Sequence, residues 1–273
     1  MDMDKDDDNI VVNNDTDPNE IEDMSLLPLT PEDWTEIQNV RLSFLSHPPD
    51  MHVVHPSFDV SDRNSALIYW SNMANQTVLD FISFFRQIDE FEGLHADDRF
   101  ILIKYNLFPI FPVSKCYNYR PMNCSPSYEE SEEAIKQSEF YKLCFESIGV
   151  RDRYGKLVVA LVELTEQDPS SLSLLLAILI FTQDLSMDED EPALKDSLAV
   201  CRAQLHYTRL FWNYMVNKYG ETETCKKFTK LLALIFEMQL VAKTFREFFH
   251  DQLASPDIVD QIEPLMRTLL HIS

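Results

Sequence analysis

Histidine and cysteine are the side chains of this sequence best suited to acid–base, nucleophilic or metal chemistry, and neither type is arranged as a recognisable site. The seven histidines are scattered, and the closest pair, His52 and His55, has no acidic or cysteine companion at metal-ligand spacing. No glycine-rich phosphate loop and no G-x-S-x-G turn occurs. We therefore expect no enzyme, no metal site and no cofactor.

The cysteines and the amino terminus indicate in which cellular compartment the protein resides. Five widely spaced cysteines, never in a C-x-x-C pair, predict reduced thiols rather than a disulfide framework or a zinc module. The amino terminus has neither a basic nor an apolar signal region, and the longest apolar run, residues 174–181, is far shorter than the roughly 20 residues of a membrane span. We expect a soluble intracellular protein with no membrane partner.

Charge and glycine content narrow the function and the fold. With 46 acidic against 23 basic residues, the net charge of -23 leaves no basis for gripping a phosphate backbone, so direct nucleic-acid binding is not expected. Four glycines in 273 residues provide few positions for the tight turns of many-stranded sheets. The composition favours one large all-α domain.

The chain divides into a tail and this domain. Residues 1–23 carry ten Asp or Glu, one Lys and no aromatic residue, so they cannot bury enough apolar surface to offset the entropy of ordering. We predict a disordered acidic tail over residues 1–28 and a folded domain over residues 29–273.

Helical spacing of apolar residues predicts about ten helices. The first begins at Thr30-Pro31, where Thr30 can cap and Asp33 completes a capping-box spacing. Pro109 and Pro112 interrupt the apolar segment 97–115 and predict two half-helices or an early end. The proline-rich stretch 46–62 reads as a loop, and further helices are expected over residues 65–92, 132–148, 156–165, 169–183, 192–219, 223–253 and 256–271.

The spacing of residues between Phe84 and Lys104 identifies a fold more specifically than the helical periodicity of apolar residues does. Phe84 is followed at 7, 10, 14, 18 and 20 residues by Phe91, Leu94, Asp98, Leu102 and Lys104. This stretch resembles the nuclear receptor ligand-binding-domain signature F-x-x-L-x-x-x-D-Q-x-x-L-L-K, with Arg99 where that family usually has Gln.

Three other segments resemble the same family in the same order. They are residues 29–34 (family helix 1), residues 174–181 followed by Asp184 (helix 8), and residues 227–232 (helix 10). Ser171 stands where helix 8 usually has an acidic residue. The resemblance implies a three-layer antiparallel helical sandwich of about ten to twelve helices, and a regulator of transcription that resides in the nucleus. Because no basic cluster resembles a nuclear localisation signal, residence in the cytoplasm stays open.

The resemblance also implies a groove for coregulator helices. Family helices 3 and 4 form an apolar groove whose basic residues cap the carbonyl end of an L-x-x-L-L helix. By position, Arg86 and Lys104 would supply this clamp, beside Phe100. The alternative, two solvated surface cations, needs no groove. A second L-x-x-L-L match, Leu172 to Leu176, lies in the most apolar helix and is expected to be core.

The other half of the clamp departs from the family. Ligand-activated members end in a helix Φ-Φ-x-E-Φ-Φ, whose Glu binds the amides at the start of the coregulator helix. Here residues 265–270 match with Thr268 in the Glu position, so we expect Leu265, Thr268 and Leu269 to contact the partner without an anionic cap. Met266 to Leu270 also resembles an L-x-x-L-L helix, which raises the hypothesis that this helix occupies its own groove.

A lipophilic ligand is implied by the resemblance alone, and its identity stays open. Aromatic residues at helical spacing usually form core, and these could fill the space instead. Ser114 stands where many members place a ligand-anchoring Arg. The candidate pocket residues are Met73, Gln76, Thr77, Phe108, Phe111, Cys116, Phe245 and Phe249.

Two functions remain. The first is a regulator responsive to a lipophilic ligand, whose DNA-binding half was lost or resides in a partner. The second is a ligand-independent adaptor or repressor that sequesters receptors or coregulators. In both, the expected partners are coactivator or corepressor helices, and a homodimer or heterodimer with another nuclear receptor through the surface at residues 227–244.

Overall fold

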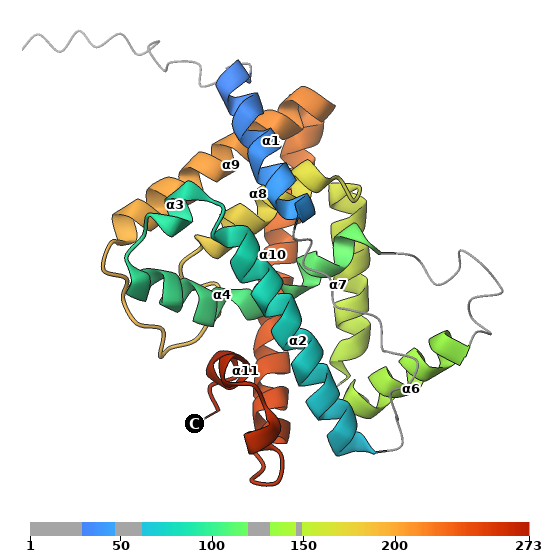
Figure 1. Ribbon diagram of the computed structural model, residues 1–273. Helices are drawn as coiled ribbons and strands as arrows, with labels where there is room; N and C mark the ends of the chain where they lie inside the picture. Colours follow the sequence, from blue (N-terminus) through green and yellow to red (C-terminus); the bar gives the residue numbers. More distant parts are fainter. Residues whose placement is uncertain (1–28, 47–61, 120–131, 146–148, 273) are drawn as a thin grey trace, which may run out of the picture.

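The computed structural model describes residues 29–46, 62–119, 132–145 and 149–272 (Figure 1). The predicted acidic tail 1–28 and the loop with His52 and His55 lie outside these residues. Within them the chain forms ten α-helices and no strand, which confirms the all-α prediction. They are α1 (Pro31–Ser46), α2 (Arg63–Phe85), α3 (Asp89–Glu92), α4 (Ala96–Tyr117), α6 (Glu132–Phe145), α7 (Val150–Thr165), α8 (Pro169–Ile180), α9 (Ser197–Tyr219), α10 (Glu221–Leu253) and α11 (Pro264–Leu269).

The start of α1 matches its predicted cap. Asp33 donates its backbone N–H to Thr30 Oγ1 at 3.1 Å, and Thr30 donates its own to Asp33 Oδ2 at 3.0 Å. This reciprocal pair satisfies two of the amides that a helix start leaves open. Ile37, Val40 and Phe44 then face the core.

The prediction that the prolines divide residues 97–115 is wrong, because α4 continues through both to Tyr117. Each proline removes a backbone donor and costs about 3 kcal/mol in an ordinary helix. Burial offsets this cost, since every residue from Tyr105 to Ser114 is buried. Near the end, Ser114 Oγ donates to the carbonyl of Phe111 at 2.7 Å.

Two other predicted helices are each interrupted. The segment 65–92 contains α2 and the single turn α3, because Ile88 is extended and turns its buried side chain into the core. The segment 256–271 contains a 3₁₀ turn (Val259–Gln261) and α11. Pro264 begins α11, and the residue before a proline is biased away from the helical region, as Glu263 is.

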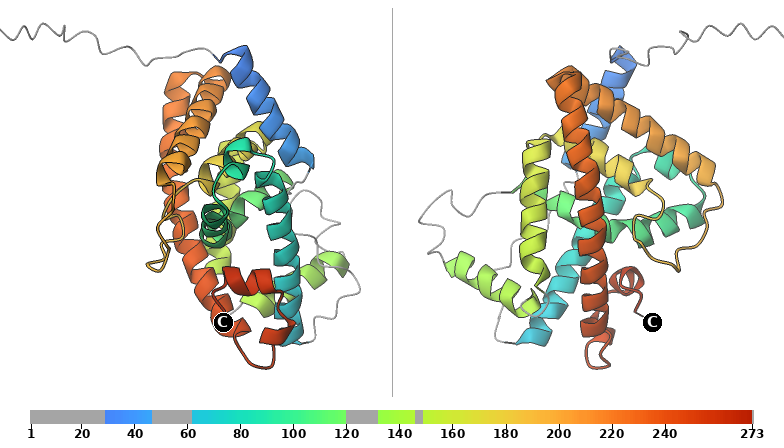
Figure 2. Two further views of the ribbon diagram at one scale, coloured as in Figure 1. Left: turned by 60° about the vertical axis from the view of Figure 1, so that its left-hand side comes forward. Right: turned by 180° about the vertical axis from the view of Figure 1, so that it is seen from behind.

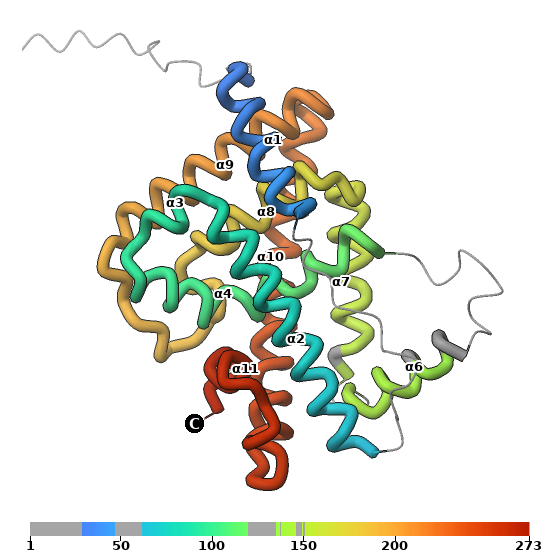
Figure 3. Tube along the Cα trace, viewed as in Figure 1, coloured from blue at the N-terminus to red at the C-terminus, as the bar shows by residue number. Residues whose placement is uncertain are grey.

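The helices pack in three layers, as Figure 2 shows from the side. α4 and α8 lie in the middle, between α1 and α2 on one side and α7 and α10 on the other. The chain path in Figure 3 returns at its end to α2 and α4, which α11 contacts. No helix among the described residues is both long and apolar enough to cross a membrane.

A buried carboxylate joins α4 to the segment before α9. Asp98 is fully buried and accepts the backbone N–H groups of Lys195 at 2.8 Å and Asp196 at 3.0 Å. Further along α4, the buried Asn106 donates to the carbonyls of Ile180 and Thr182, both at 2.8 Å, at the end of α8. These two side chains position the first half of α4.

Replacing Asp98 by Ala should lower the free energy of unfolding by about 2–3 kcal/mol, because two buried amides lose a charged acceptor. Asp97→Ala is the control, since Asp97 is exposed and its ion pair with Lys195 is worth at most about 1 kcal/mol. Urea unfolding followed by circular dichroism measures both. Equal losses in the two variants would contradict this role for Asp98.

Candidate functional site

A shallow surface hollow lies where the end of α2, the turn α3 and the start of α4 meet. Ile82 and Arg86 line it from α2, Phe91 and Glu92 from α3, and Arg99 and Ile103 from α4. Phe91 is fully buried and so forms part of the floor. The site therefore combines apolar side chains with two cations and one anion.

The exposed faces of α2 and α4 extend this hollow into an apolar groove. Leu79 precedes Ile82 by three residues, so both lie on the face of α2 that ends at Arg86. On α4, Phe100 precedes Ile103 by three residues and Lys104 by four. Leu79 is 42% exposed and Phe100 54% exposed, so both add apolar surface beside the hollow. We call the surface formed by the six residues that line the hollow together with Leu79, Phe100 and Lys104 the α2–α4 groove.

Glu92 joins the two arginines of the groove. Its carboxylate lies 3.4 Å from Arg86 Nε and 2.7 Å from Arg99 Nη1, and Arg99 also donates to the Glu92 carbonyl at 3.1 Å. Hydrogen bonding from Arg99, then from Arg86, holds the pKa of Glu92 below its ordinary value. Arg99, which stands where the family usually has Gln, thus pairs with Glu92. Because the Arg86 pair is exposed, a docking segment could displace it at little cost.

Lys104 lies on the α4 side of the groove. Its Nζ sits 5.0 Å from the centre of the Tyr105 ring, within the range of a cation–π contact. The Tyr105 hydroxyl donates to the carbonyl of Asp190 at 3.1 Å, which fixes the ring beneath the lysine. Of the two predicted clamp cations, Arg86 lines the hollow, whereas Lys104 lies next to Ile103 on α4 and does not line it.

The terminal helix packs on the core and leaves the hollow open. Met266, Leu269 and Leu270 are fully buried, and no α11 residue lines the hollow. Leu269 is therefore a core residue and not a groove residue, and the structure disfavours the hypothesis that α11 occupies its own groove. Leu265 and Thr268 are half-buried. The Thr268 hydroxyl donates to the carbonyl of Pro264 at 2.9 Å, so its proton is used within the helix.

A small polar network holds the end of the chain. Asp188, in the segment between α8 and α9, lies 3.0 Å from Nη1 of the buried Arg246 of α10 and 3.3 Å from Nδ1 of His271. Arg246 also donates to the carbonyl of Ser186 at 3.3 Å. The His271 ring packs edge-on against Tyr105, 5.3 Å between centres. Burial, followed by the charges of Arg246 and Lys104, lowers the pKa of His271.

The predicted ligand-pocket residues mostly lie together in the core. Seven of the eight are buried, whereas Gln76 is exposed and donates to Asp80 at 3.0 Å, so it does not face the interior. Phe249 stacks on Trp70 at 3.5 Å, and both Phe245 and Phe249 lie 5.5 Å from Phe145. Aromatic rings thus contact one another where a ligand was expected. The buried members are Met73, Thr77, Phe108, Phe111, Cys116, Phe245 and Phe249.

The polar groups of this region are occupied by the helices themselves. Thr77 donates to the carbonyl of Met73 at 3.2 Å, and Cys116 contacts that of Pro112 at 3.4 Å. Burial raises the pKa of the Cys116 thiol to about 12, so it stays protonated at neutral pH. Ser114, at the usual arginine position, is buried and bonded to Phe111.

The family comparison agrees with this architecture. Residues 65–250 match the model of the family described as the ligand-binding domain of nuclear hormone receptor. The chain belongs to the nuclear hormone receptor ligand-binding domain family. A search of curated proteins finds no match. Helices α1 and α11 lie outside the matched residues, yet both pack on the same core cluster through Ile37, Phe44, Met266 and Leu269.

Some residues of the groove in this nuclear receptor domain were not predicted. Ile82, Glu92 and Ile103 line the hollow together with Arg99, which the sequence marked only as a departure from the family. Helical spacing could have found two of them, because Ile82 lies four residues before Arg86 and Ile103 three after Phe100. No spacing rule joins Glu92 to Arg86, since a turn separates them.

Lower pH should loosen the terminal segment. The pKa of His271 is lower in the folded state than in the unfolded state. Its contribution to the free energy of unfolding is therefore complete above about pH 6.5 and is lost as the pH falls below that value. The groups facing it are Asp188, Arg246, Lys104 and His250. Hydrogen exchange over residues 264–272, corrected for intrinsic rates, should be faster at about pH 5.5 than at about pH 7.5.

His271→Gln is the control, because it removes the titrating ring and should flatten the pH dependence of exchange in this segment. An equally steep dependence in the variant would assign the effect to other groups.

Proposed function

We propose that this nuclear receptor domain, over residues 29–273, regulates transcription in the nucleus by binding the helical segments of coregulator proteins in the α2–α4 groove. The observation that carries the proposal is the pairing of an exposed apolar surface with clamp cations. Ile82, Phe100 and Ile103 provide the surface, and Arg86 and Lys104 the charges.

The partner chemistry follows from these groups. An amphipathic helix buries its apolar side chains by lying along the groove. Its last carbonyls have no partner within the helix, and cations placed there contribute about 0.3–1 kcal/mol each. Arg86 is 65% exposed and held only by an exposed ion pair, so it is free to turn toward such a helix end.

We also propose that the groove forms without a ligand. In a ligand-responsive domain, the bound molecule would complete the core and so hold the terminal helix. Here Trp70, Phe145, Phe245 and Phe249 contact one another in the interior. Met266 and Leu269 already pack on α2 and α4, and His271 is held beside Asp188. This supports the ligand-independent adaptor over the ligand-responsive regulator.

Dimerisation with another receptor is a second candidate function. Leu232, Phe236 and Leu240 of α10 follow one another at four-residue spacing and are 58%, 67% and 44% exposed. Such a stripe on one helix face is a common feature of helix–helix interfaces. It lies within the predicted surface 227–244, and adaptor function could use it together with the groove.

Fluorescence anisotropy of labelled coregulator helices tests the groove. Lys104→Ala and Arg86→Ala should each weaken binding of an L-x-x-L-L peptide about two- to fivefold, the equivalent of about 0.3–1 kcal/mol. Lys226→Ala is the matched control, because this exposed lysine lies on α10 and pairs only locally with Glu223. Longer corepressor helices in the same assay indicate the sign of regulation. No binding by either peptide class would remove the coregulator mechanism.

Restoring the missing anion should strengthen binding. Thr268→Glu places a carboxylate where the amides at the start of the docked helix need an acceptor, so affinity should rise about two- to fivefold. Thr268→Gln is the neutral control and should change affinity little. If both substitutions act alike, charge at this position does not contribute to peptide binding.

A further inference from the structure

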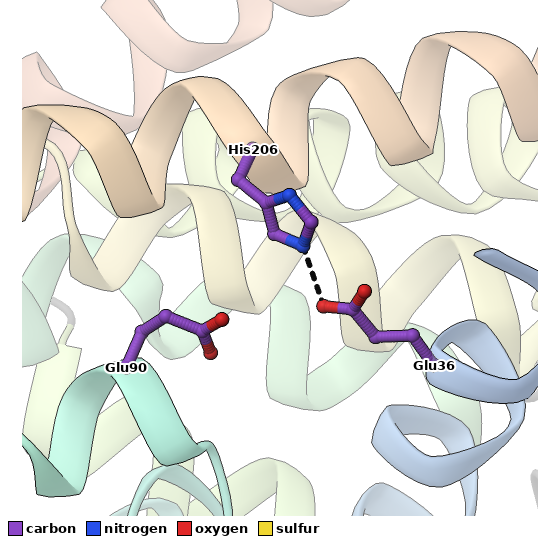
Figure 4. Close-up of side chains that lie close together, drawn as sticks. All are labelled: Glu36, Glu90 and His206. Carbon is purple, nitrogen blue, oxygen red and sulfur yellow. Dashed lines mark hydrogen bonds and ion pairs between the residues drawn. The ribbon is translucent and has the colours of Figure 1, made fainter. Parts of the chain in front are cut away.

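Three potential metal ligands from three different helices converge on the side of the molecule opposite the terminal helix. Glu36 comes from α1, Glu90 from α3 and His206 from α9, and their ligand atoms all lie within 4.8 Å of one another (Figure 4). In Figure 4 the imidazole ring and both carboxylates point toward the same space between the helices. The chain separates Glu36 from His206 by 170 residues, so only the fold brings them together.

The donor types suit zinc. Zn²⁺ accepts imidazole nitrogen and carboxylate oxygen, and its bonds of about 2.0–2.2 Å place tetrahedral ligand atoms about 3.3 Å apart. His206 Nε2 lies 2.6 Å from Glu36 Oε1, closer than this spacing, whereas the cluster spans up to 4.8 Å. Glu90 is exposed, so small adjustments of its side chain that keep the hydrogen bond from Tyr207 need no repacking of the core.

The surroundings also favour a cation. Tyr207 donates its hydroxyl to Glu90 Oε2 at 2.6 Å, which orients this carboxylate and leaves its other oxygen for a metal. Arg209, whose charge acts on His206, is paired with Asp33 at 3.0 Å. The side chains of Glu36 and His206 are each 31% exposed, so water reaches the cluster and can complete the coordination.

We propose that Glu36, Glu90 and His206 form a zinc-binding site that links α1, α3 and α9, with water as the fourth ligand. A zinc ion here would connect the first helix to α3. That turn also supplies Phe91 and Glu92 to the groove, so the ion would restrain one wall of it. The site does not depend on coregulator binding.

Zinc titration of the metal-free full-length chain tests the proposal. Isothermal titration should show one tight equivalent in the Cys124→Ser, Cys201→Ser, Cys225→Ser background. These substitutions remove the two thiols that are exposed among the described residues, and Cys124, which lies outside them. In that background His206→Gln and Glu90→Gln should each weaken Zn²⁺ binding at least about tenfold, the usual cost of losing a ligand or its support. His250→Gln is the matched control, because His250 is an exposed histidine of α10 beside one carboxylate.

Two further readouts distinguish a built site from general acidity. Co²⁺ should give the strong visible absorption of four-coordinate geometry in the parent and in His250→Gln, and lose it in both site variants. Zn²⁺ should raise the melting temperature of the parent and not that of the variants. Glu90→Gln keeps an oxygen for Tyr207, so it covers the case in which His206→Gln fails to fold. Equal affinity in parent and site variants, or no tight equivalent, would overturn the proposal.

Discussion

The molecule depends on α4, which is buried from Tyr105 to Ser114 while its first two turns reach the surface. The buried half is held by contacts with α7, α8 and α10 and by the donors of Asn106. The exposed half is positioned by Asp98, which joins it to the segment before α9. Since Phe100, Ile103 and Lys104 lie on that half, the geometry of the groove follows from the same packing that stabilises the core.

Several features could be predicted from residues because they are local. The cap of α1 requires only Thr30 and Asp33, three residues apart. The apolar composition of α8 is enough to predict that this helix is buried, as it is. The signature from Phe84 to Lys104 predicted the fold family for a physical reason. Among the residues of this signature, Phe91 forms the floor of the hollow, Asp98 is the buried carboxylate and Lys104 is the surface cation.

Other features depend on contacts between distant segments and could not be read from spacing. The continuity of α4 through Pro109 and Pro112 results from burial on all sides, which a local rule for proline does not contain. The pairing of Glu92 with Arg86 and Arg99 needs the turn at α3, and the placing of Glu36 beside His206 needs three helices. Gln76 was assigned to the ligand pocket through the family resemblance, yet it is exposed and donates to Asp80.

The interior and the end of the chain are connected through α10. Aromatic packing around Phe249 supports α10, and Arg246 on that helix binds Asp188, which also contacts His271. The terminal helix is thus held by the protein's own side chains.

The most direct test of this account is the affinity of a coregulator peptide before and after the purified protein is stripped of bound lipophilic molecules by organic extraction and refolding. The proposed ligand-independent mechanism predicts the same dissociation constant in both preparations, because α11 is then held by its contacts with α2 and α4 alone. Loss of binding after stripping, restored by adding back the extract, would show that a ligand completes the structure and would contradict it.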